Sequence, residues 1–203
     1  MLDLKPVILA SGSKTRAQIL LRAGISYEIV PPEIEEGIVK RRVRRDQIRI
    51  NNSDTALILA EQKAVCVSKA LPGRFVIGAD QILELDGEII NKPTNLEQAK
   101  SQLARLSGRS HELISAVSIV YNGTNIWNHV DCARLWIRTL NTEFIDIYLD
   151  QIGDAAFTSP GAYQIEGIGI QLFDRMDGNH YTILGMPLLP LLNFLRKKKL
   201  VPT

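Results

Sequence analysis

Residues 7–24 decide the fold, and they read VILASGSKTRAQILLRAG. Four apolar residues stop at a Ser-Gly-Ser turn, and apolar residues then recur at helical spacing until Gly24. This pattern predicts a strand, a tight turn and a helix that ends at a glycine. The free N–H groups and the dipole of a helix N-terminus suit phosphate, although Ser11 or Ser13 could serve only as the helix cap. The run GSKT is not a Walker A loop, because that pattern requires glycine in place of Ile8 and Ser13.

The rest of the chain alternates helix and strand signals in the same way. Helices are predicted at about 54–71, 93–106, 141–150 and 187–198, and strands at 26–30, 75–78, 111–121, 125–139 and, as a glycine-rich pair, 162–173. The Thr94-x-x-Glu97 pattern is typical of a capping box, and the pairs Asp86-Gly87 and Asn122-Gly123 suit tight hairpin turns. Parallel-type crossovers mixed with long hairpins favour an α/β (mixed α+β) fold, in which helices flank a mixed sheet.

Composition excludes several classes of protein. With 203 residues, 45% of them hydrophobic and 23% charged, the chain has the composition of an ordinary globular protein. Its longest apolar stretch, Ile183 to Leu195, has 13 residues and falls short of the roughly 20 that span a bilayer. The first residues lack the apolar run of a secretory signal, so we expect a cytoplasmic protein without a membrane partner. Two basic stretches, 40–49 and 196–199, leave a mildly acidic remainder, which argues against nucleic acid as a partner.

A carboxylate and two lysines stand at positions that suit phosphate chemistry. Asp80 follows an apolar strand, and a carboxylate at the carboxyl end of a strand can hold a metal ion or activate a water. Lys63 lies at the edge of the apolar stripe of the 54–71 helix, and Lys92 precedes Pro93. Compact cations neutralise the charge that develops on phosphate oxygens. Each of the three is also compatible with an ordinary solvated surface charge.

Acidic and glycine-rich segments add weaker signals. Glu33, Glu35 and Glu36 follow a double proline and could supply a Mg²⁺ ligand, with solvated surface as the ordinary alternative. Three glycines between residues 161 and 169 interrupt a predicted strand, which implies a bulge or a close ligand. The three histidines are far apart in the sequence, so a zinc site built from local ligands has little support. Any metal here should be a hard ion held by carboxylates.

Seven segments follow one another in order along the chain: LASGSKTR at 9–16, PPEIEE at 31–36, LAEQKA at 59–64, IGADQILELDGEIINKP at 77–93, LSGRSHE at 106–112, GAYQIEGIGIQLF at 161–173 and GNHYTILGMPL at 178–188. Taken together, they resemble the Maf family of nucleoside triphosphate pyrophosphatases. The resemblance implies one domain over residues 1–203, with a fold related to inosine triphosphate pyrophosphatases and two lobes around a nucleotide cleft. It also implies a homodimer, and a house-cleaning hydrolase that splits nucleoside triphosphates between the α and β phosphates. Such an enzyme releases a monophosphate and pyrophosphate and requires Mg²⁺ or Mn²⁺.

The resemblance also assigns roles to individual residues. Glu36 and Asp80 correspond to the catalytic and metal-binding carboxylates of the family, with Asp80 as the group that activates water or binds the ion. The other matched positions would bind the phosphates of the substrate: Ser11, Gly12, Ser13, Arg16, Lys63 and Lys92. These assignments agree with phosphate chemistry, because a nucleophile can approach phosphorus only after the negative charges around it are screened.

Two further residues bear on the choice of substrate. Members that act on dTTP and UTP usually have Thr after the strand-end Asp and Gln near the glycines, whereas this chain has Gln81 and Glu166. It is therefore more similar to the branch that acts on 7-methyl-GTP. The Glu166 carboxylate could accept hydrogen bonds from the N1–H and amino groups of guanine, which pyrimidines lack. A pyrophosphatase of the dTTP and UTP type is the alternative within the family.

The sequence departs from the family pattern in two places and leaves other functions open. Thr15 stands where many members carry a second basic residue. The run Thr158-Ser159-Pro160 stands where many members have Asp-Lys-Ala. A rival of another class is a non-enzymatic cell-division regulator that contacts nucleic acid through residues 40–49. A serine hydrolase built on Ser11 or Ser13 ranks last, because the chain has no Gly-x-Ser-x-Gly motif.

Overall fold

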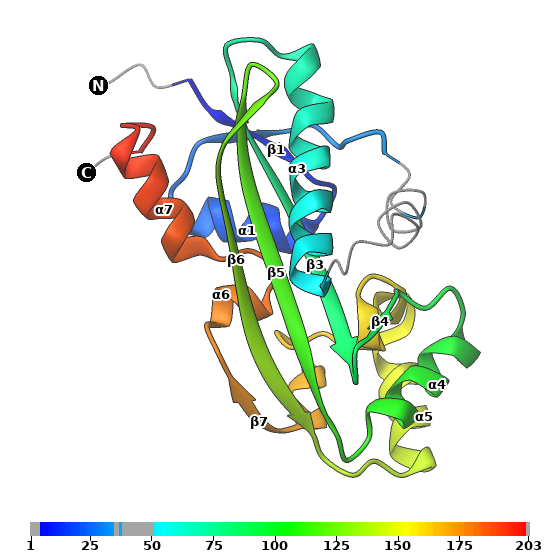
Figure 1. The fold of residues 1–203 in the computed structure, drawn as a ribbon. Coiled ribbons are helices and arrows are strands. Elements are labelled where there is room, and N and C mark those ends of the chain that lie inside the picture. Colours follow the sequence, from blue (N-terminus) through cyan, green and yellow to red (C-terminus); the bar gives the residue numbers. More distant parts are fainter. Residues whose placement is uncertain (1–4, 35–36, 38–50, 202–203) are drawn as a thin grey trace. The chain divides into compact units, whose positions relative to one another are not determined.

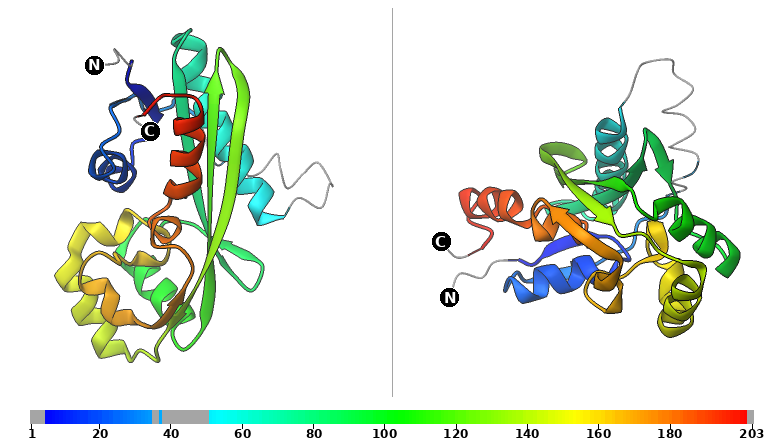
Figure 2. Two further views of the ribbon diagram at one scale, coloured as in Figure 1. Left: turned by 90° about the vertical axis from the view of Figure 1, so that its left-hand side faces the viewer. Right: turned by 90° about the horizontal axis from the view of Figure 1, so that it is seen from below.

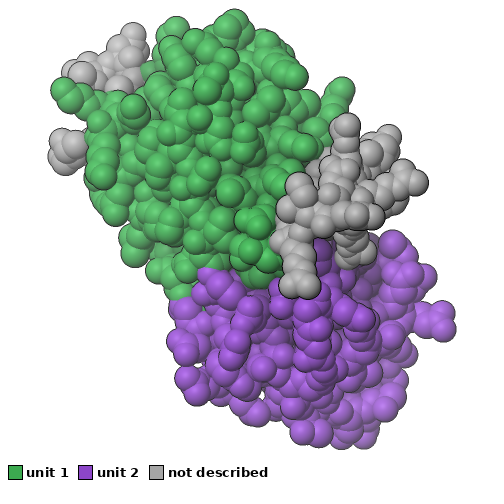
Figure 3. Space-filling view, in the orientation of Figure 1, with its two compact units in different colours: residues 1–81, 114–131, 179–203 green, residues 82–113, 132–178 purple. Residues whose placement is uncertain are grey.

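The computed structural model describes residues 5–34, 37 and 51–201, and Figure 1 shows their fold. Two compact units divide the chain (Figure 3): residues 1–81, 114–131 and 179–203 form unit 1, and residues 82–113 and 132–178 form unit 2. The chain passes between the units within three long strands, β3 (Phe75–Leu85), β5 (Ser110–Tyr121) and β6 (Thr124–Ile137), and between residues 178 and 179. The nucleotide cleft between two lobes stays a prediction.

Seven strands form one mixed sheet. Their order is β2-β1-β3-β5-β6-β7, with β4 paired to β3. β1 pairs in parallel with both β2 and β3, whereas the β3–β4 and β6–β7 pairs are antiparallel. The shorter strands are β1 (Val7–Ala10), β2 (Tyr27–Ile29), β4 (Glu88–Ile90) and β7 (Phe173–Asp177). The predicted mixed α/β class is therefore confirmed.

Helices cover both faces of the sheet in unit 1. They are α1 (Lys14–Arg22), α3 (Asn52–Ala70), α6 (His180–Ile183) and α7 (Leu188–Lys197). Val7 and Leu9 of β1 belong to one apolar cluster with α1 and α7, and Ile8 and Ala10 belong to another with α3. Because successive strand residues face opposite sides, α1 and α7 cover one face and α3 covers the other, as Figure 2 shows. The continuous apolar run of β1 thus reflects burial on both faces.

Unit 2 combines two helices with three short 3-10 turns. They are α4 (Leu96–Leu106), α5 (Thr142–Ile152), η1 (Gly153–Phe157), η2 (Pro160–Ala162) and η3 (Ile168–Leu172). The predicted hairpin between β3 and β4 is confirmed, since Asp86 and Gly87 have the positive φ angles, 52° and 82°, that a type I′ turn requires. Among the described residues of both units, no helix is both long and apolar enough to cross a membrane.

The glycine-rich strand pair predicted at 162–173 is wrong. The segment forms η2, a turn and η3, and a strand begins only at Phe173. Gly161 has a φ of +79°, and a Cβ on Gly169 would lie 2.4 Å from the carbonyl oxygen of Gln164. The glycines therefore let the chain fold back on itself, and the close neighbour that the sequence implied is backbone of the same segment.

The start of α4 lies later than the predicted capping box. Asn95 is the N-cap, and its side chain accepts a hydrogen bond from the Gln98 N–H at 2.9 Å. The Gln98 side chain in turn accepts from the N–H of Thr94 at 2.9 Å. Asn and Thr are both good caps, and here Asn95 is the cap while the Gln98 side chain, in place of Glu97, bonds back to the residue before it.

Candidate functional site

The structure places seven of the predicted site residues in unit 1. They are Ser11, Gly12, Ser13, Arg16, Lys63, Asp80 and Gln81. Lys92 and Glu166 belong to unit 2. Glu36 lies outside the described residues, so its predicted role, and the choice among Glu33, Glu35 and Glu36, stay predictions.

The turn between β1 and α1 presents the N-terminus of a helix. Ser13 is the N-cap of α1, and its side chain accepts a hydrogen bond from the Arg16 N–H at 3.3 Å. The buried Ser11 hydroxyl accepts from the Ser13 N–H at 3.2 Å and from Arg16 Nη1 at 3.3 Å. Gly12 is exposed, and no described atom lies within 4 Å of the position that a Cβ would occupy there. The capping role of Ser13 is confirmed, and a ligand can approach the described backbone at Gly12.

Asp80 lies beyond the end of β1 rather than at the end of its own strand. β3 continues to Leu85, so the prediction that Asp80 follows a strand is wrong for β3. The strand and the hairpin after it, which the sequence analysis treated as separate, form one continuous strand. Ala10, the last residue of β1, partners Gly78, and Asp80 is two residues further along β3. Asp80 is therefore level with the turn that follows β1, at the carboxyl end of that strand.

Asp80 forms a buried ion pair with Lys63 of α3. Lys63 Nζ lies 2.5 Å from Asp80 Oδ1, and the two residues are only 6% and 5% exposed. Gly78 explains how they meet, because a Cβ at Gly78 would lie 2.0 Å from the Ala60 carbonyl oxygen of α3. Without that Cβ, α3 lies directly against β3 and brings Lys63 to Asp80. Charges so deeply buried persist only in pairs, so the solvated-surface alternative is excluded for both.

Gln81 points to the face of β3 opposite to this ion pair. Its amide nitrogen lies 3.0 Å from each of three acceptors, which are Ser115 Oγ and the carbonyl oxygens of Thr182 and Ile183. The Ser115 hydroxyl also donates to the Thr182 carbonyl at 2.8 Å, and the Thr182 hydroxyl donates to Asp131 at 2.6 Å. Sequence reasoning missed Ser115, Thr182 and Asp131, and only the family-like segment 178–188 hinted at one of them.

The two predicted site residues of unit 2 are exposed. Lys92 follows β4, and Glu166 lies in the turn between η2 and η3. The N–H of Gly167 closes this turn by donating to the Gln164 carbonyl at 3.2 Å. Both side chains are therefore accessible to a ligand that arrives from solvent.

A buried pair in unit 2 was also missed from the sequence. His111 Nε2 lies 2.7 Å from the Tyr163 hydroxyl, and both rings contact Phe173. Burial lowers the pKa of His111 to about 4 and raises the pKa of Tyr163 well above its usual value. His111 Nδ1 has no hydrogen-bond partner in the described ranges. Both side chains are therefore neutral near pH 7.

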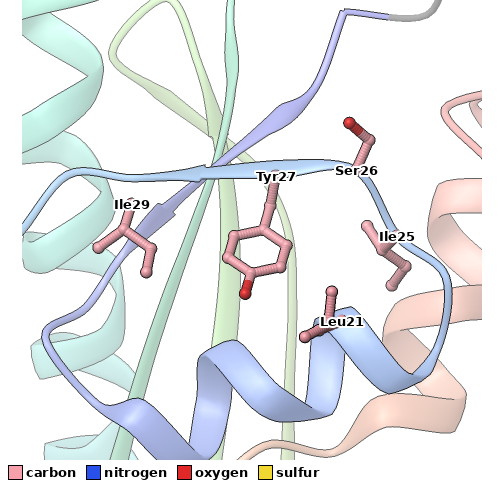
Figure 4. A pocket seen from close by; sticks show the side chains of 5 residues that line it. All are labelled: Leu21, Ile25, Ser26, Tyr27 and Ile29. Carbon is pink, nitrogen blue, oxygen red and sulfur yellow. The ribbon is translucent and has the colours of Figure 1, made fainter.

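A surface hollow between α1 and β2 is separate from these residues. Figure 4 shows its lining, in which Tyr27 and Ile29 project from β2 and Leu21 from α1, with Ile25 and Ser26 between the two elements. Its described lining carries no charged side chain. A triphosphate needs cations or aligned N–H groups, so this hollow does not suit one.

Asp80 is the described site carboxylate that could hold a divalent cation. Within residues 5–34, 37 and 51–201, no group of three or more His, Cys, Asp or Glu side chains could hold a metal ion. This donor set fits Mg²⁺, which proteins usually bind through one or two carboxylates together with substrate phosphates and waters. Asp80, level with the turn at the N-terminus of α1, therefore suits a hard ion that binds together with a phosphate ligand.

Comparison with known proteins identifies related sequences over nearly the whole chain. The family model for Maf-like proteins matches residues 6–198. A protein of Rhodopseudomonas palustris (strain BisB5), described as a nucleoside triphosphate pyrophosphatase, is 46% identical over 197 residues, which are 97% of this chain and 96% of that protein. A protein of Brucella abortus biovar 1 (strain 9-941), described as a 7-methyl-GTP pyrophosphatase, is 44% identical over 195 residues, which are 96% of this chain and 97% of that protein.

Solved structures show a weaker likeness. The nucleoside triphosphatase / dITP/XTP pyrophosphatase from Mycobacterium abscessus has a TM-score of 0.40 and 16% identity, covering 97% of this chain and 96% of that chain. A HAM1 protein from Coxiella burnetii has a TM-score of 0.41 and 17% identity, covering 65% of this chain and 72% of that chain. Scores this low add nothing to the match with the family model.

Proposed function

Because the chain belongs to the Maf family, we propose that this nucleoside triphosphate pyrophosphatase acts on 7-methyl-GTP. The reaction cleaves the bond between the α and β phosphates and releases 7-methyl-GMP and pyrophosphate. The observation that carries the proposal is the buried Lys63–Asp80 pair, level with the turn at Gly12. The methylated substrate is supported by the resemblance to the 7-methyl-GTP branch of the family at Gln81 and Glu166, and by the 44% identity to the protein described as a 7-methyl-GTP pyrophosphatase.

The triphosphate is proposed to bind at the start of α1. Helix N-termini attract phosphate because their first N–H groups have no partner within the helix and carry the positive end of its dipole. Gly12 and the N-cap Ser13 directly precede these groups, which belong to Lys14 and the next residue of α1. Arg16 adds a guanidinium from the first turn of the helix. Lys92 of unit 2 is proposed as a further cation for the phosphates, on the resemblance alone.

Asp80 is proposed to orient the attacking water and accept its proton. The water oxygen bonds to the α-phosphorus, the bond from that phosphorus to the bridging oxygen breaks, and pyrophosphate leaves with the electron pair. Lys63 fixes the orientation of the carboxylate through the 2.5 Å contact with Oδ1. When bound, Mg²⁺ or Mn²⁺ supplies Lewis acidity that stabilises the charge on the phosphate oxygens, and Asp80 and Glu36 are the residues that would hold it.

Glu166 is proposed to recognise the base. Its exposed carboxylate can accept hydrogen bonds from both the N1–H and the amino group of guanine. Methylation at N7 places a positive charge on the purine ring, and a carboxylate acceptor is stronger against a charged donor. UTP and dTTP lack both the amino group and this charge.

Pyrophosphate release from a panel of triphosphates tests the substrate. We expect a kcat/KM for 7-methyl-GTP at least about tenfold above those for UTP and dTTP, since one charge-assisted hydrogen bond contributes about that much. A preference for UTP or dTTP would identify the pyrimidine-type enzyme instead. If no triphosphate releases pyrophosphate while RNA or DNA binds in a salt-sensitive way, the non-enzymatic alternative is correct.

The variant Asp80→Asn tests the catalytic role directly. Asparagine keeps the shape but accepts no proton, so kcat should fall about 100- to 10,000-fold while the Kd for nucleotide stays within about threefold. Rapid-quench measurement of turnover and calorimetric measurement of binding give the two values. Asp146→Asn, at an exposed position on α5, is the matched control and should change neither. A near-normal rate for Asp80→Asn contradicts the assignment.

A further inference from the structure

The segment 178–188 has no part in the reaction proposed above, yet it reaches Arg16. The Gly185 carbonyl accepts a hydrogen bond from Arg16 Nε at 2.9 Å, across 169 residues of sequence. Arg16 Nη1 donates to the Ser11 hydroxyl at 3.3 Å. Because these contacts use two different nitrogens of a planar group, they fix both the position and the plane of the guanidinium.

The backbone at the end of α6 aims the Gly185 carbonyl at Arg16. The N–H groups of Gly185 and Met186 donate to carbonyl oxygens of α6, both at 3.0 Å, in the Schellman pattern that ends a helix on a glycine. Gly185 has a φ of +94°, which L side chains rarely adopt. A Cβ on Gly185 would also lie 3.5 Å from Gln81 Oε1 and 3.6 Å from Arg16 Nη2. Glycine is therefore needed here for its backbone conformation, because a Cβ at those distances would make only ordinary van der Waals contacts.

Side chains from three strands hold residues 182–186, hereafter the α6 turn. Gln81 of β3 donates to the carbonyls of Thr182 and Ile183, and Ser115 of β5 also donates to the Thr182 carbonyl. Asp131 of β6 accepts from the Thr182 hydroxyl. Thr182 is completely buried and Ile183 is 6% exposed, so loss of Asp131 or Gln81 would remove the hydrogen bond of the Thr182 hydroxyl or of the Ile183 carbonyl. The turn is thus fixed from β3, β5 and β6 at once.

We propose that Gln81 and the α6 turn are positioning elements for Arg16. Gln81 does not read the base in this arrangement. It fixes the turn whose Gly185 carbonyl presents the guanidinium to the triphosphate. A guanidinium held in place before binding loses less freedom when phosphate arrives. The inference rests on the proposed function, in which Arg16 binds phosphate. It implies that changes in Gln81 or in the α6 turn weaken the binding of all nucleoside triphosphates to the same extent.

Binding of inorganic triphosphate, which has no base, is the first test. Gln81→Met keeps the length of the side chain but removes the amide, and we expect calorimetry in Mg²⁺ to give a Kd about tenfold higher. Arg16→Lys should weaken binding by about tenfold or more, and the double variant should bind no more weakly than Arg16→Lys alone. Gln18→Met, on the exposed side of α1, is the matched control and should bind like the wild type.

Kinetics with two bases separate positioning from base recognition. Gln81→Met should raise KM by the same factor for 7-methyl-GTP and for UTP, with a smaller change in kcat. A loss confined to one base, or losses that multiply in the double variant, would overturn the proposal, because Gln81 would then contact the substrate itself. If Arg16→Lys binds inorganic triphosphate normally, the phosphate role in the proposed function fails. If only Gln81→Met binds normally, the positioning role alone fails.

Thr182 gives a second test that does not depend on the folding of Gln81→Met. Thr182→Val keeps the shape but removes the hydroxyl that donates to Asp131, and Thr182→Ser keeps the hydroxyl. We expect the Kd for inorganic triphosphate to rise about fivefold in the valine variant and to return to within about twofold of wild type in the serine variant. Equal affinities in the two variants, at melting temperatures that show both are folded, would overturn the proposal.

Discussion

Among the described residues, each unit contains a buried, directly bonded pair of polar side chains, and the two pairs differ in charge. Lys63–Asp80 in unit 1 is ionic, whereas His111–Tyr163 in unit 2 is neutral near pH 7. All four residues are at most 6% exposed, so burial alone does not separate them. A neutral pair is sufficient to connect two segments, and an ionic pair costs more desolvation. The difference teaches that unit 1 retains buried charge at the place of the proposed chemistry, whereas unit 2 connects its segments through a neutral hydrogen bond.

Removing one partner of the ionic pair should have the largest effect on stability. Lys63→Met leaves the Asp80 carboxylate buried without its cation, and the free energy of unfolding in urea should fall by about 3–5 kcal/mol. The double variant with Asp80→Asn should recover much of this loss while remaining inactive. Lys100→Met is the control, because its ion pair with Asp146 is exposed and should contribute less than about 1 kcal/mol. If Lys63→Met also loses less than about 1 kcal/mol, the buried pair does not differ in stability from the exposed pair.

Separating α3 from β3 should weaken the ionic pair without altering either partner. In Gly78→Ala the added methyl group would lie 2.0 Å from the Ala60 carbonyl oxygen, so α3 must move. We expect a loss of about 3 kcal/mol in chemical denaturation and lower kcat. Gly12→Ala is the matched control, because no described atom lies within 4 Å of its Cβ position. It should keep wild-type stability and raise only KM. Equal stability of the two variants would contradict the contact.

Acid should weaken the neutral pair through His111. Burial lowers the pKa of His111 from 6.5 to about 4, so between these values the unfolded chain takes up a proton that the folded chain does not. This contribution to stability is present above pH 6.5 and is lost as the pH falls toward 4. From pH 6.5 to pH 4 the free energy of unfolding of the wild type should fall by about 2–3 kcal/mol more than that of His111→Gln. Parallel pH profiles for the two proteins would be the contrary result.

The hydrogen bond itself should account for the smallest effect. Tyr163→Phe keeps the ring against Phe173 but removes the hydroxyl 2.7 Å from His111 Nε2. Stability at pH 7 should fall by about 1 kcal/mol, the usual contribution of one neutral hydrogen bond. Because phenylalanine also leaves His111 buried, the pH dependence should persist. Thermal unfolding at pH 7 and pH 5 would measure the stability and its pH dependence. A loss of stability as large as that of Lys63→Met would mean that the neutral and ionic pairs do not differ as described.

The sequence was sufficient to predict elements whose periodicity is local. The continuous run of β1, the apolar stripe of α3 and the Asp86-Gly87 turn depend on neighbouring residues, and each was recovered. The segment 162–173 was not, because glycines interrupt a strand and permit a folded-back turn equally well, and only the approach of Gly169 to Gln164 distinguishes the two. Local periodicity therefore predicts an element, and it does not predict how a glycine-rich segment folds.

For the site residues, too, local patterns were predicted and contacts between distant segments were missed. The residue types of Asp80 and Lys63 pointed to phosphate chemistry, but their pairing depends on how closely α3 approaches Gly78. The bond from Arg16 to Gly185 joins positions 169 residues apart, and no spacing rule connects them. The sequence alone therefore predicted which residue types matter and missed the contacts that orient them.

Asp80 and Gln81 are adjacent in sequence and lie on opposite sides of β3, with Asp80 bonded to α3 and Gln81 to α6. A slip of β3 by one residue against β1 would turn each of them to the opposite face. After a deletion the amide would take the place of the carboxylate opposite the Lys63 ammonium, to which it cannot supply a charge, and the carboxylate would move to the other face of the strand. Deleting a single residue from the first half of β3 would thus do more than shorten a strand, because it would invert the polarity of both faces at once.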